Sequence, residues 1–390
     1  MELKKWLPVV GVTLCAFVFN TSEFMPIGLL TDIARDFHTT EAHAGMLISV
    51  YAWFVALLSL PLMLLVCRME MRRLLLCIVG LFIASHVASA LSQTYLQLML
   101  SRIGVAMAHS IFWSIASPMA VRTVPESKRS AALSIVATGS SVAMVVGLPL
   151  GRVIGIVMGW RMTFLTIGIV AALIMVFLFA VLPTLPTRNS FSVRKMPLLL
   201  KDTVLVRIYM VTVLFATAHY TGYSYIEPLL GQIGHFQPDT VTLILICFGA
   251  AGTLGSYIFS RFYGGCPRRF ITASIFVVAA SLLLLRASAF SLPGAIALCV
   301  AWSAAATAFN VAFQASILSQ APEEATAVAM SIFSGIFNLG IGSGAFIGGT
   351  VCTHVGLSAI GYVGAVIALA AALGYVVGHG RMKSIGAQVV

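Results

Sequence analysis

Charged residues are scarce in this chain. Only 9% of its 390 residues are Asp, Glu, Lys or Arg, whereas 60% are hydrophobic, and the mean hydropathy is +1.02. A soluble domain of this length would need a far larger charged surface around its core. The composition therefore excludes an ordinary soluble protein and predicts one that crosses a membrane many times.

The chain also lacks the residue clusters on which most enzymes and metal proteins depend. Its seven cysteines lie far apart, without a CxxC pair or a histidine at metal-ligand spacing, so we expect apolar fillers and no metal or cofactor. No paired intramembrane aspartates or zinc triad occur, and the candidate for a serine nucleophile loop, Gly139 to Ser141, has no following glycine. An intramembrane hydrolase is disfavoured, and we expect no enzymatic activity.

The excess of basic residues has a simple explanation in membrane topology. The net charge is +11, but lysines and arginines are spread through short connections, so no nucleic-acid partner is expected. Nearly all of these lysines and arginines lie in the connections of one side, and the opposite side holds only Arg35, Arg161 and Arg286. The positive-inside rule places the arginine-rich side, and with it both termini, in the cytoplasm.

Twelve apolar runs are long enough to cross the hydrocarbon core, which takes about 20 residues of helix. They must be helical because an open sheet edge cannot be satisfied in lipid. The first run continues to Leu30 without a small-residue cleavage site, so we expect an uncleaved first span rather than a signal peptide. The predicted spans are 6–30, 44–66, 74–91, 96–120, 131–158, 162–182, 204–230, 240–260, 270–289, 294–319, 327–351 and 359–379.

The chain divides into two halves of related sequence. The segment VPESKRSAALSI (124–135) matches APEEATAVAMSI (321–332) at a constant offset of 197. Six spans per half give both repeats the same membrane orientation, with a pseudo-twofold axis along the membrane normal and substrate carried at the interface between the halves. The predicted fold is an all-α membrane protein of twelve transmembrane helices in two parallel six-helix repeats, 1–182 and 204–390, joined by a cytoplasmic linker at 183–203. The same offset places Gly147, Gly151 and Gly159 on Gly344, Gly348 and Gly356.

Two acids lie inside spans, whereas the other acids fall in or beside polar connections. Glu23 interrupts the first span within FNTSEFMPIGLL (19–30), and Glu227 has the corresponding place in the second half. A carboxylate at such depth costs about 3 kcal/mol, so it is kept only where it faces a cavity, a partner or a proton path. For Glu227 two alternatives remain, hydrogen bonding to substrate hydroxyls and simple hydration at the outer mouth.

Basic residues accompany Glu23 at a similar height. At about 1.5 Å per residue, Glu23 lies roughly 25 Å from the cytoplasmic side, and Arg102 and Arg152 also fall in the outer part. An arginine keeps its proton, whereas a carboxylate out of water can take one up and release it. We predict Glu23 as the proton carrier, Arg102 as the charge that tunes it, and His109 as the best candidate for a histidine relay. Arg152 is a further predicted proton-coupling residue. A static ion pair that joins two helices is the alternative.

A glycine pattern in the fifth span resembles a known family. Gly147, Gly151, Gly155 and Gly159 recur every fourth residue around Pro149, which gives a stripe for close helix contact and a weak point in the hydrogen-bond ladder. This resembles the glycine-proline motif of the twelve-span drug:proton antiporter group of the major facilitator superfamily. The resemblance covers essentially the whole chain and implies a monomeric protein of the bacterial inner membrane.

Two further motifs of that group are present in altered form. LMLSRIGVAMAH (98–109) places Arg102 at the family's buried motif arginine, which implies a role in proton coupling, although Val105 and Ala106 replace the usual Gln-Gly. The loop after the second span, CRMEMRR (67–73), lacks the usual aspartate and glycine. Cytoplasmic ion pairs that hold the two halves together would therefore differ from those of the family, and Glu70 is the acid available for them.

Longer strings, such as YAWFVALLSLPLMLL and AHYTGYSYIEP, are similar to the sugar-efflux branch of the group, whose members export arabinose and isopropyl-thiogalactoside. The resemblance implies small sugars or glycosides as substrates. Sugar hydroxyls need polar side chains, and the apolar face of a pyranose needs aromatic ones. The candidate substrate-binding residues are Asn20, Glu23, His109, Phe112, Trp113, His219, Tyr220, Tyr223, Glu227, Phe309, Asn310, Gln314, Ser334 and Asn338.

The leading hypothesis is proton-coupled efflux of small sugars or glycosides by alternating access, with sugar, protons and the lipid bilayer as partners. The alternative is a proton-coupled exporter of cationic or amphiphilic drugs, which would set its acids against substrate charge in an oilier cavity. The Asn, Gln, His and Tyr residues favour sugar. A channel is disfavoured, because the two-half repeat and the charges inside spans suit alternating access better than a continuous pore.

Overall fold

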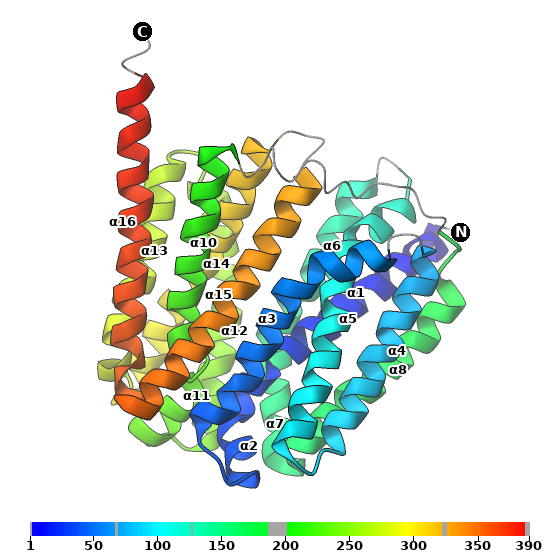
Figure 1. Ribbon diagram of the computed structural model, residues 1–390, viewed down its shortest axis with the longest axis horizontal. Helices are drawn as coiled ribbons and strands as arrows, with labels where there is room; N and C mark the ends of the chain where they lie inside the picture. Colours follow the sequence, from blue (N-terminus) through cyan, green and yellow to red (C-terminus); the bar gives the residue numbers. More distant parts are fainter. Residues whose placement is uncertain (1, 67–68, 126–127, 186–200, 322–325, 387–390) are drawn as a thin grey trace. The chain divides into compact units, whose positions relative to one another are not determined.

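The computed structural model describes residues 2–66, 69–125, 128–185, 201–321 and 326–386, and no strand occurs among them (Figure 1). Twelve helical segments in these ranges are long and apolar enough to cross a membrane, and each overlaps a predicted span. The predicted all-helical fold with twelve transmembrane helices is confirmed. Most of the expected linker, 186–200, lies outside the described residues, as do 126–127 and 322–325 of the repeated loop segment.

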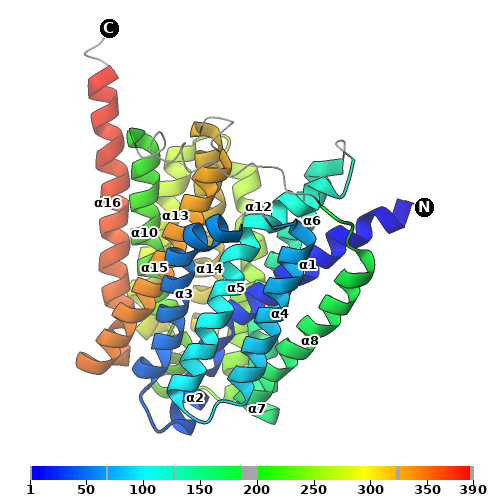
Figure 2. The same cartoon turned by 45° about the vertical axis from the view of Figure 1, so that its right-hand side comes forward.

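The described residues group into two compact units, 1–191 and 192–390. The first unit contains six spans, and Figure 2 shows two of its helices, α4 and α5, side by side. Its elements are α1 (Glu2–Phe24), η1 (Met25–Leu29) and α2 (Leu30–Asp36) in the first span, then α3 (Glu41–Val66), α4 (Met71–Ala90), α5 (Tyr95–Arg122), α6 (Arg129–Val142), η3 (Ala143–Gly147), α7 (Leu148–Met158) and α8 (Trp160–Val181).

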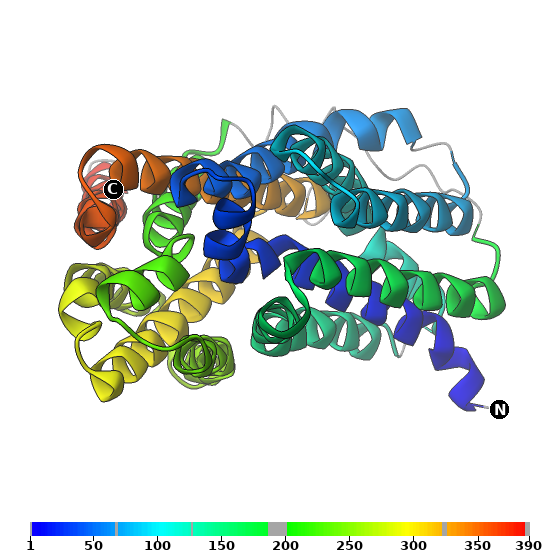
Figure 3. The ribbon, with the colours of Figure 1, turned by 90° about the horizontal axis from the view of Figure 1, so that it is seen from below.

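The second unit contains the other six spans. The seventh span of the chain, which is the first of this unit, is broken in the same way as the first span. The last helix of the unit, α16, is viewed nearly along its axis in Figure 3 (red). Its elements are α10 (Thr203–Tyr223), α11 (Ile226–Pro228), η5 (Leu229–Ile233), α12 (Pro238–Phe262), α13 (Pro267–Ser288), α14 (Leu292–Gln320), α15 (Thr326–His354), η7 (Leu357–Ala359) and α16 (Ile360–Gly386).

Corresponding helices pack in the same pairs in both units. Helix α1 contacts α6 and α8, and its counterpart α10 contacts α15 and α16. Helix α5 lies against α3 and α4, as α14 lies against α12 and α13. Helix α8 contacts α4, as α16 contacts α13. The repeated sequence therefore folds into a repeated six-helix arrangement.

The glycine stripe of the fifth span packs against the first span. A π-helical segment, Ala143–Gly147, precedes Pro149, at the turn where the missing N–H of proline interrupts the α-helical ladder. Because glycine has no side chain, the stripe lets the fifth span approach the first span closely. An added Cβ would meet Thr21 from Gly147, Met25 from Gly151 and Leu29 from Gly155.

The eleventh span approaches the seventh span closely enough to touch its backbone. A Cβ on Gly344 would lie 2.5 Å from the carbonyl oxygen of Thr217, and one on Gly348 would lie 2.6 Å from that of Thr221. A flexible side chain could rotate away from such a contact, but a helix carbonyl cannot. Only glycine fits at these two positions without moving one helix away from the other.

Gly348→Ala is expected to destabilise the folded protein by about 1–3 kcal/mol, because overpacking forces the two helices apart. The matched control is Gly80→Ala in α4, where a Cβ would meet no atom within 4 Å and the better helix propensity of alanine gives a neutral or slightly stabilising change. Thermal unfolding of both variants in detergent measures the difference. Equal melting temperatures for the two variants would contradict the packing described.

Two further glycines end the fifth and eleventh spans at corresponding positions. Gly159 has φ +88° and Gly356 has φ +116°, a backbone region that side chains with a Cβ rarely adopt. The next helix begins at the following residue in each case, Trp160 and Leu357. These glycines therefore let the chain reverse between adjacent spans without a longer loop.

Glu70 caps the N-terminus of α4 within the first unit. Its carboxylate accepts hydrogen bonds from the N–H groups of Arg72 at 3.0 Å, Arg73 at 2.9 Å and Leu185 at 2.6 Å. Partial burial acts to raise the pKa of the Glu70 carboxyl, but the three N–H groups and the Arg73 charge outweigh it and hold the pKa below its usual value. The carboxylate thus joins the start of α4 to the end of the sixth span.

Glu70→Gln is expected to cost about 1 kcal/mol of stability at pH 7, because an amide offers one acceptor oxygen where the carboxylate offers two. Since the folded-state pKa is lowered, the native contribution is fully present above the unfolded-state value of about 4.3 and is lost as the pH falls through the folded value. Thermal unfolding across this range measures it. The two melting temperatures should converge in acid, and a constant difference would contradict the capping role.

Candidate functional site

The first span breaks where its polar residues lie. Helix α1 ends at Phe24, and the 3₁₀ segment η1 continues to Leu29. Pro26 has no N–H, so the carbonyl oxygen of Ser22, four residues earlier, loses its α-helical partner. That oxygen accepts a hydrogen bond from Arg102 Nη2 of α5 at 3.1 Å. The proline thus exposes the backbone acceptor that holds the buried arginine.

Arg102 is fully buried beside this break. Its Nη1 donates to Ser22 Oγ at 3.1 Å, and its guanidinium carbon lies 4.5 Å from the ring centroid of Tyr51 and 5.8 Å from that of Phe164. Cation–π contacts within about 6 Å stabilise a guanidinium that has lost its water. The positive charge is therefore fixed at one place in the first unit.

A histidine of α4 belongs to the same group. His86 Nδ1 lies 2.9 Å from the carbonyl oxygen of Phe82, and because a carbonyl only accepts, Nδ1 carries the proton. Nε2 then accepts the hydroxyl proton of Ser22 at 2.8 Å. His86 was not among the predicted site residues, although a histidine inside an apolar span is itself a signal of function. It orients the Ser22 hydroxyl so that its oxygen accepts from Arg102.

Glu23 and His109 form an ionisable pair in the same region. Glu23 Oε2 lies 3.7 Å from His109 Nε2, and their side chains are 9% and 2% exposed. The same Nε2 accepts a hydrogen bond from Trp113 Nε1 at 2.9 Å, while the Tyr51 hydroxyl lies 2.8 Å from Nδ1. Because an indole only donates, Nε2 carries no proton when the Trp113 bond is made.

One nitrogen atom therefore serves two neighbours that require opposite protonation states. Without a proton, His109 Nε2 accepts from Trp113, and Glu23 interacts well with it only as a protonated carboxyl. With a proton, the imidazolium pairs with the Glu23 carboxylate, and Trp113 loses its acceptor. The position of one proton thus decides the hydrogen bonding of the half-buried Trp113 indole.

The structure brings the predicted residues together but pairs them differently from the expectation. Glu23 has its ion pair with His109, whereas the sequence placed Arg102 opposite it. Arg102 donates instead to Ser22. Tyr51 contacts both His109 and Arg102, so it connects the Glu23–His109 pair with the fixed charge.

Arg152 supports the break from the fifth span. It is 5% exposed, and its Nη1 donates to the carbonyl oxygen of Gly28 at 2.6 Å, inside η1. Asn20, a predicted substrate-binding residue, is also buried in α1. Arg152 therefore holds the backbone of the first span within its broken segment, a few residues beyond the Glu23 position.

Two predicted substrate-binding aromatics, Phe112 and Phe309, lie in the helix packing. Both are fully buried. Phe112 stacks on Phe19 with ring centroids 4.5 Å apart, and Phe309 stacks on Phe215 at 3.6 Å. A side chain without exposed surface cannot touch a substrate in this conformation. These two phenylalanines lie 197 residues apart, the offset of the repeat, and their role here is to join α5 to α1 and α14 to α10.

The second unit has an aromatic group around His219. Trp302 Nε1 donates to His219 Nδ1 at 3.0 Å. Tyr223 stacks on His219 with ring centroids 5.3 Å apart and on Phe248 at 4.6 Å, and Tyr220 meets the histidine edge-on at 4.8 Å. Trp302 was not among the predicted site residues. It is a fully buried tryptophan, which sequence alone does not distinguish from ordinary packing.

The side-chain amides predicted as substrate-binding in the second unit make hydrogen bonds within their own helices. Gln314 donates to Asn310 Oδ1 one turn away, and Asn338 donates to the Ser334 carbonyl oxygen at 3.1 Å. Asn310, Gln314 and Ser334 are partly exposed.

Glu227 is 5% exposed in α11, where the seventh span is broken. Both intramembrane acids therefore lie at a helix break.

Twelve membrane-crossing helices in two repeats, with ionisable side chains buried inside the spans, define a polytopic membrane transport protein. The chain matches the family model of the Major Facilitator Superfamily over residues 12–262 and 208–383, and it belongs to this family. As a member of this family it is a transporter and not an enzyme.

Three solved structures of similar fold have low sequence identity to this chain. A bacterial homologue of the human lysosomal transporter Spinster, inward-facing and unoccupied, aligns with a TM-score of 0.79 and 15% identity over 97% of each chain. Its occupied form gives 0.75 and 17% over 95% of this chain and 96% of that one. The human organic anion transporter MFSD10 (TETRAN) gives 0.70 and 14% over 95% and 99%. At such identities the likeness shows the fold alone.

Proposed function

We propose that this transporter exports small sugars or glycosides, of the arabinose or galactoside type, in exchange for protons by alternating access. The observation that carries the proposal is the shared nitrogen, because His109 Nε2 contacts both Glu23 and the Trp113 indole. A buried acid and histidine inside a span are costly residues that commonly serve proton relays. An indole offers a flat surface for the apolar face of a sugar ring and a polar N–H beside it.

In the proposed cycle, a proton from outside binds to the Glu23–His109 pair, and Trp113 loses its acceptor. The indole then leaves the arrangement that holds the sugar, so proton binding favours sugar release. Loss of the proton to the cytoplasm restores the Trp113 bond and with it the sugar-binding arrangement. Arg102 supplies a fixed positive charge beside the pair throughout the cycle.

The second unit contributes hydrogen-bonding groups suited to hydroxyls. Asn310, Gln314 and Asn338 carry amides, and each amide offers both donors and acceptors. Tyr223 adds an aromatic face beside His219. Ser334, Tyr220 and Glu227 complete the proposed substrate set together with Asn20 of the first unit.

The proposal includes the place of the protein in the cell. Lysines and arginines gather on one side of the spans, which supports cytoplasmic termini in a bacterial inner membrane. Residues 1–182 and 204–390 act as the two repeats of a monomeric exporter, and 183–203 joins them.

The second candidate function is proton-coupled export of cationic or amphiphilic compounds. Two acids inside spans favour it, because Glu23 is 8% and Glu227 5% exposed, and a carboxylate in such surroundings attracts a cationic partner. The amides of the second unit favour sugar, since a hydrophobic cation makes no use of them.

Transport in liposomes separates these functions. The purified protein is reconstituted, the liposomes are loaded with labelled arabinose, isopropyl-thiogalactoside or a cationic dye, and an acidic outer medium is applied. We expect the sugars to leave faster than from liposomes without a pH gradient. Movement of the dye alone would support the second candidate. Sugar movement that ignores the gradient would overturn the antiport mechanism.

Trp113→Phe tests the link between proton and sugar. Phenylalanine keeps an aromatic face but has no N–H, so we expect sugar binding to remain measurable while its pH dependence is largely lost. The matched control is Trp160→Phe, which removes an indole N–H that has no hydrogen-bond partner among the described residues. Sugar affinity measured by isothermal titration between pH 5 and 8 gives the comparison. An unchanged pH profile in Trp113→Phe would contradict the proposed link.

A further inference from the structure

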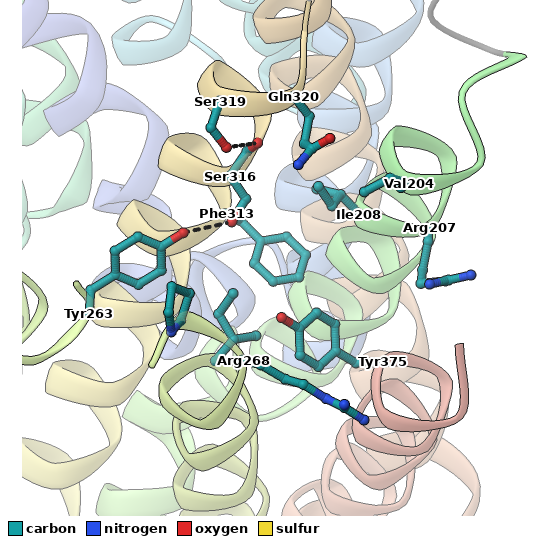
Figure 4. Close-up of a pocket in the computed structure, with 12 residues that line it drawn as sticks. Val204, Arg207, Ile208, Tyr263, Arg268, Phe313, Ser316, Ser319, Gln320 and Tyr375 are labelled. Carbon is teal, nitrogen blue, oxygen red and sulfur yellow. Dashed lines mark hydrogen bonds between the residues drawn. The ribbon is translucent and has the colours of Figure 1, made fainter. Parts of the chain in front are cut away.

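A cavity of about 380 Å³ opens at the arginine-rich end of the second unit (Figure 4). Helices α10, α13, α14 and α16 surround it, together with the residue that follows α12. It lies apart from the His219 group and the Asn310–Gln314 pair, none of which lines it. The transport cycle proposed above makes no use of it.

The lining of this cavity is basic and rich in hydrogen-bonding groups. Arg207 and Arg268 are both half-buried in its wall, and the described residues that line it include no acid. Tyr263 Oη and Ser316 Oγ lie 3.0 Å apart on one side, and Gln320 adds an amide. Such a combination of guanidinium and hydroxyl groups suits the oxygens of a phosphate.

Among the described residues, the acid nearest in sequence to those that line the cavity already accepts hydrogen bonds from the backbone. Asp202 caps α10 by accepting hydrogen bonds from the N–H groups of Val204 at 2.7 Å and Leu205 at 3.1 Å. Arg268 donates to the Val376 carbonyl oxygen at 3.3 Å, which uses one of the five N–H groups of a guanidinium. The other N–H groups of Arg268 can donate to a ligand, and its side chain extends beside Tyr375 (Figure 4).

The depth of the cavity is that of lipid headgroups. Its wall contains residues at the very ends of the membrane-crossing segments, since Val204 and Pro267 lie at the start of spans 203–233 and 267–288, and Ser316 lies at the end of span 292–317. Its floor is apolar, with Phe313 fully buried. Beside it, α16 exposes Leu373 and other apolar side chains at the level where acyl chains would run.

We propose that this cavity binds the phosphate-bearing headgroup of an anionic phospholipid, with the acyl chains lying along α16. Basic pockets between transmembrane helices are a recognised chemistry for anionic headgroups. The bound lipid joins α10, α13, α14 and α16 at one end of the unit and stabilises the folded state by mass action. Free inorganic phosphate offers the same oxygens but no acyl chains, so the two sources are distinguishable.

The test is thermal unfolding of the full chain in a neutral detergent with one of three additions: short-chain phosphatidylglycerol, short-chain phosphatidylcholine or inorganic phosphate. We expect phosphatidylglycerol alone to raise the melting temperature, by about 3 °C or more at saturation. Arg207→Gln/Arg268→Gln should lose this rise. The matched control, Arg261→Gln/Arg269→Gln, removes two exposed arginines of the same end outside the cavity and should keep it.

Each other outcome overturns the proposal. An equal rise in the cavity variant and the control would show that the arginines of the cavity are not used. An equal rise of the melting temperature with phosphatidylcholine would show that anionic charge is not required. A rise with inorganic phosphate alone would show that the cavity binds a free anion and not a lipid. If the double variant shows no cooperative unfolding, Arg268→Gln alone is compared with Arg269→Gln. Native mass spectrometry of retained phosphatidylglycerol gives an independent count.

Discussion

Glu23→Gln is expected to abolish transport driven by a pH gradient while the protein still folds and binds sugar. Glutamine has nearly the same shape as glutamate but cannot take up a proton, and the ion pair with His109, 3.7 Å away in the native protein, cannot form. Without a carboxylate to stabilise an imidazolium, His109 Nε2 keeps its bond to Trp113 when the outside is acidified. Gradient-driven sugar efflux should fall to the rate measured without a gradient, and exchange of sugar for sugar should continue.

The control for this variant is Asp36→Asn, the same chemical change at the end of the same span. Asp36 is paired with Arg161 at 2.6 Å, and the two side chains are 40% and 37% exposed. An exposed pair contributes about 0–1 kcal/mol, so its loss should leave coupling intact. Undiminished gradient-driven efflux in Glu23→Gln would contradict a role of Glu23 in proton transfer. This conclusion would not depend on which sugar the protein carries.

Arg102→Lys is expected to destabilise the first unit and stop transport, although the charge is kept. The guanidinium donates from Nη1 to Ser22 Oγ and from Nη2 to the Ser22 carbonyl oxygen while it lies over the Tyr51 ring. A lysine ammonium is a single point on a flexible stem and cannot make these contacts together. A buried charge that loses its partners costs about 3–5 kcal/mol. The melting temperature in detergent and the efflux rate measure the two effects.

Arg161→Lys is the matched control for this substitution. Arg161 also donates to a carbonyl oxygen, that of Ser92, and lies over a ring, that of Trp160. It is 37% exposed, however, so water can replace the lost contacts. We expect a change of less than about 1 kcal/mol. A comparable loss in the two variants would show that burial does not distinguish them, and normal efflux in Arg102→Lys would contradict the role of the fixed guanidinium.

The sequence was sufficient to predict the twelve spans and their repetition. The thickness of the hydrocarbon core sets the length of an apolar run, and a matched segment at an offset of 197 relates the two halves. It was also sufficient to single out Glu23 and Arg102, since the cost of burying a charge in lipid makes such residues rare. The spacing of the glycine stripe predicted close packing, and its counterpart Gly348 lies directly against the backbone of the seventh span.

The partners of these residues were decided by the tertiary structure alone. Glu23 contacts His109 rather than Arg102, Arg102 occupies the carbonyl that Pro26 leaves open, and Phe112 is covered by packing. In a soluble protein the apolar stripe of a helix shows which face is buried, but lipid is as apolar as the core, so a membrane span carries no such record of its rotation. Sequence therefore determined which polar side chains lie in the membrane, and only the packing of the helices determined which of them meet.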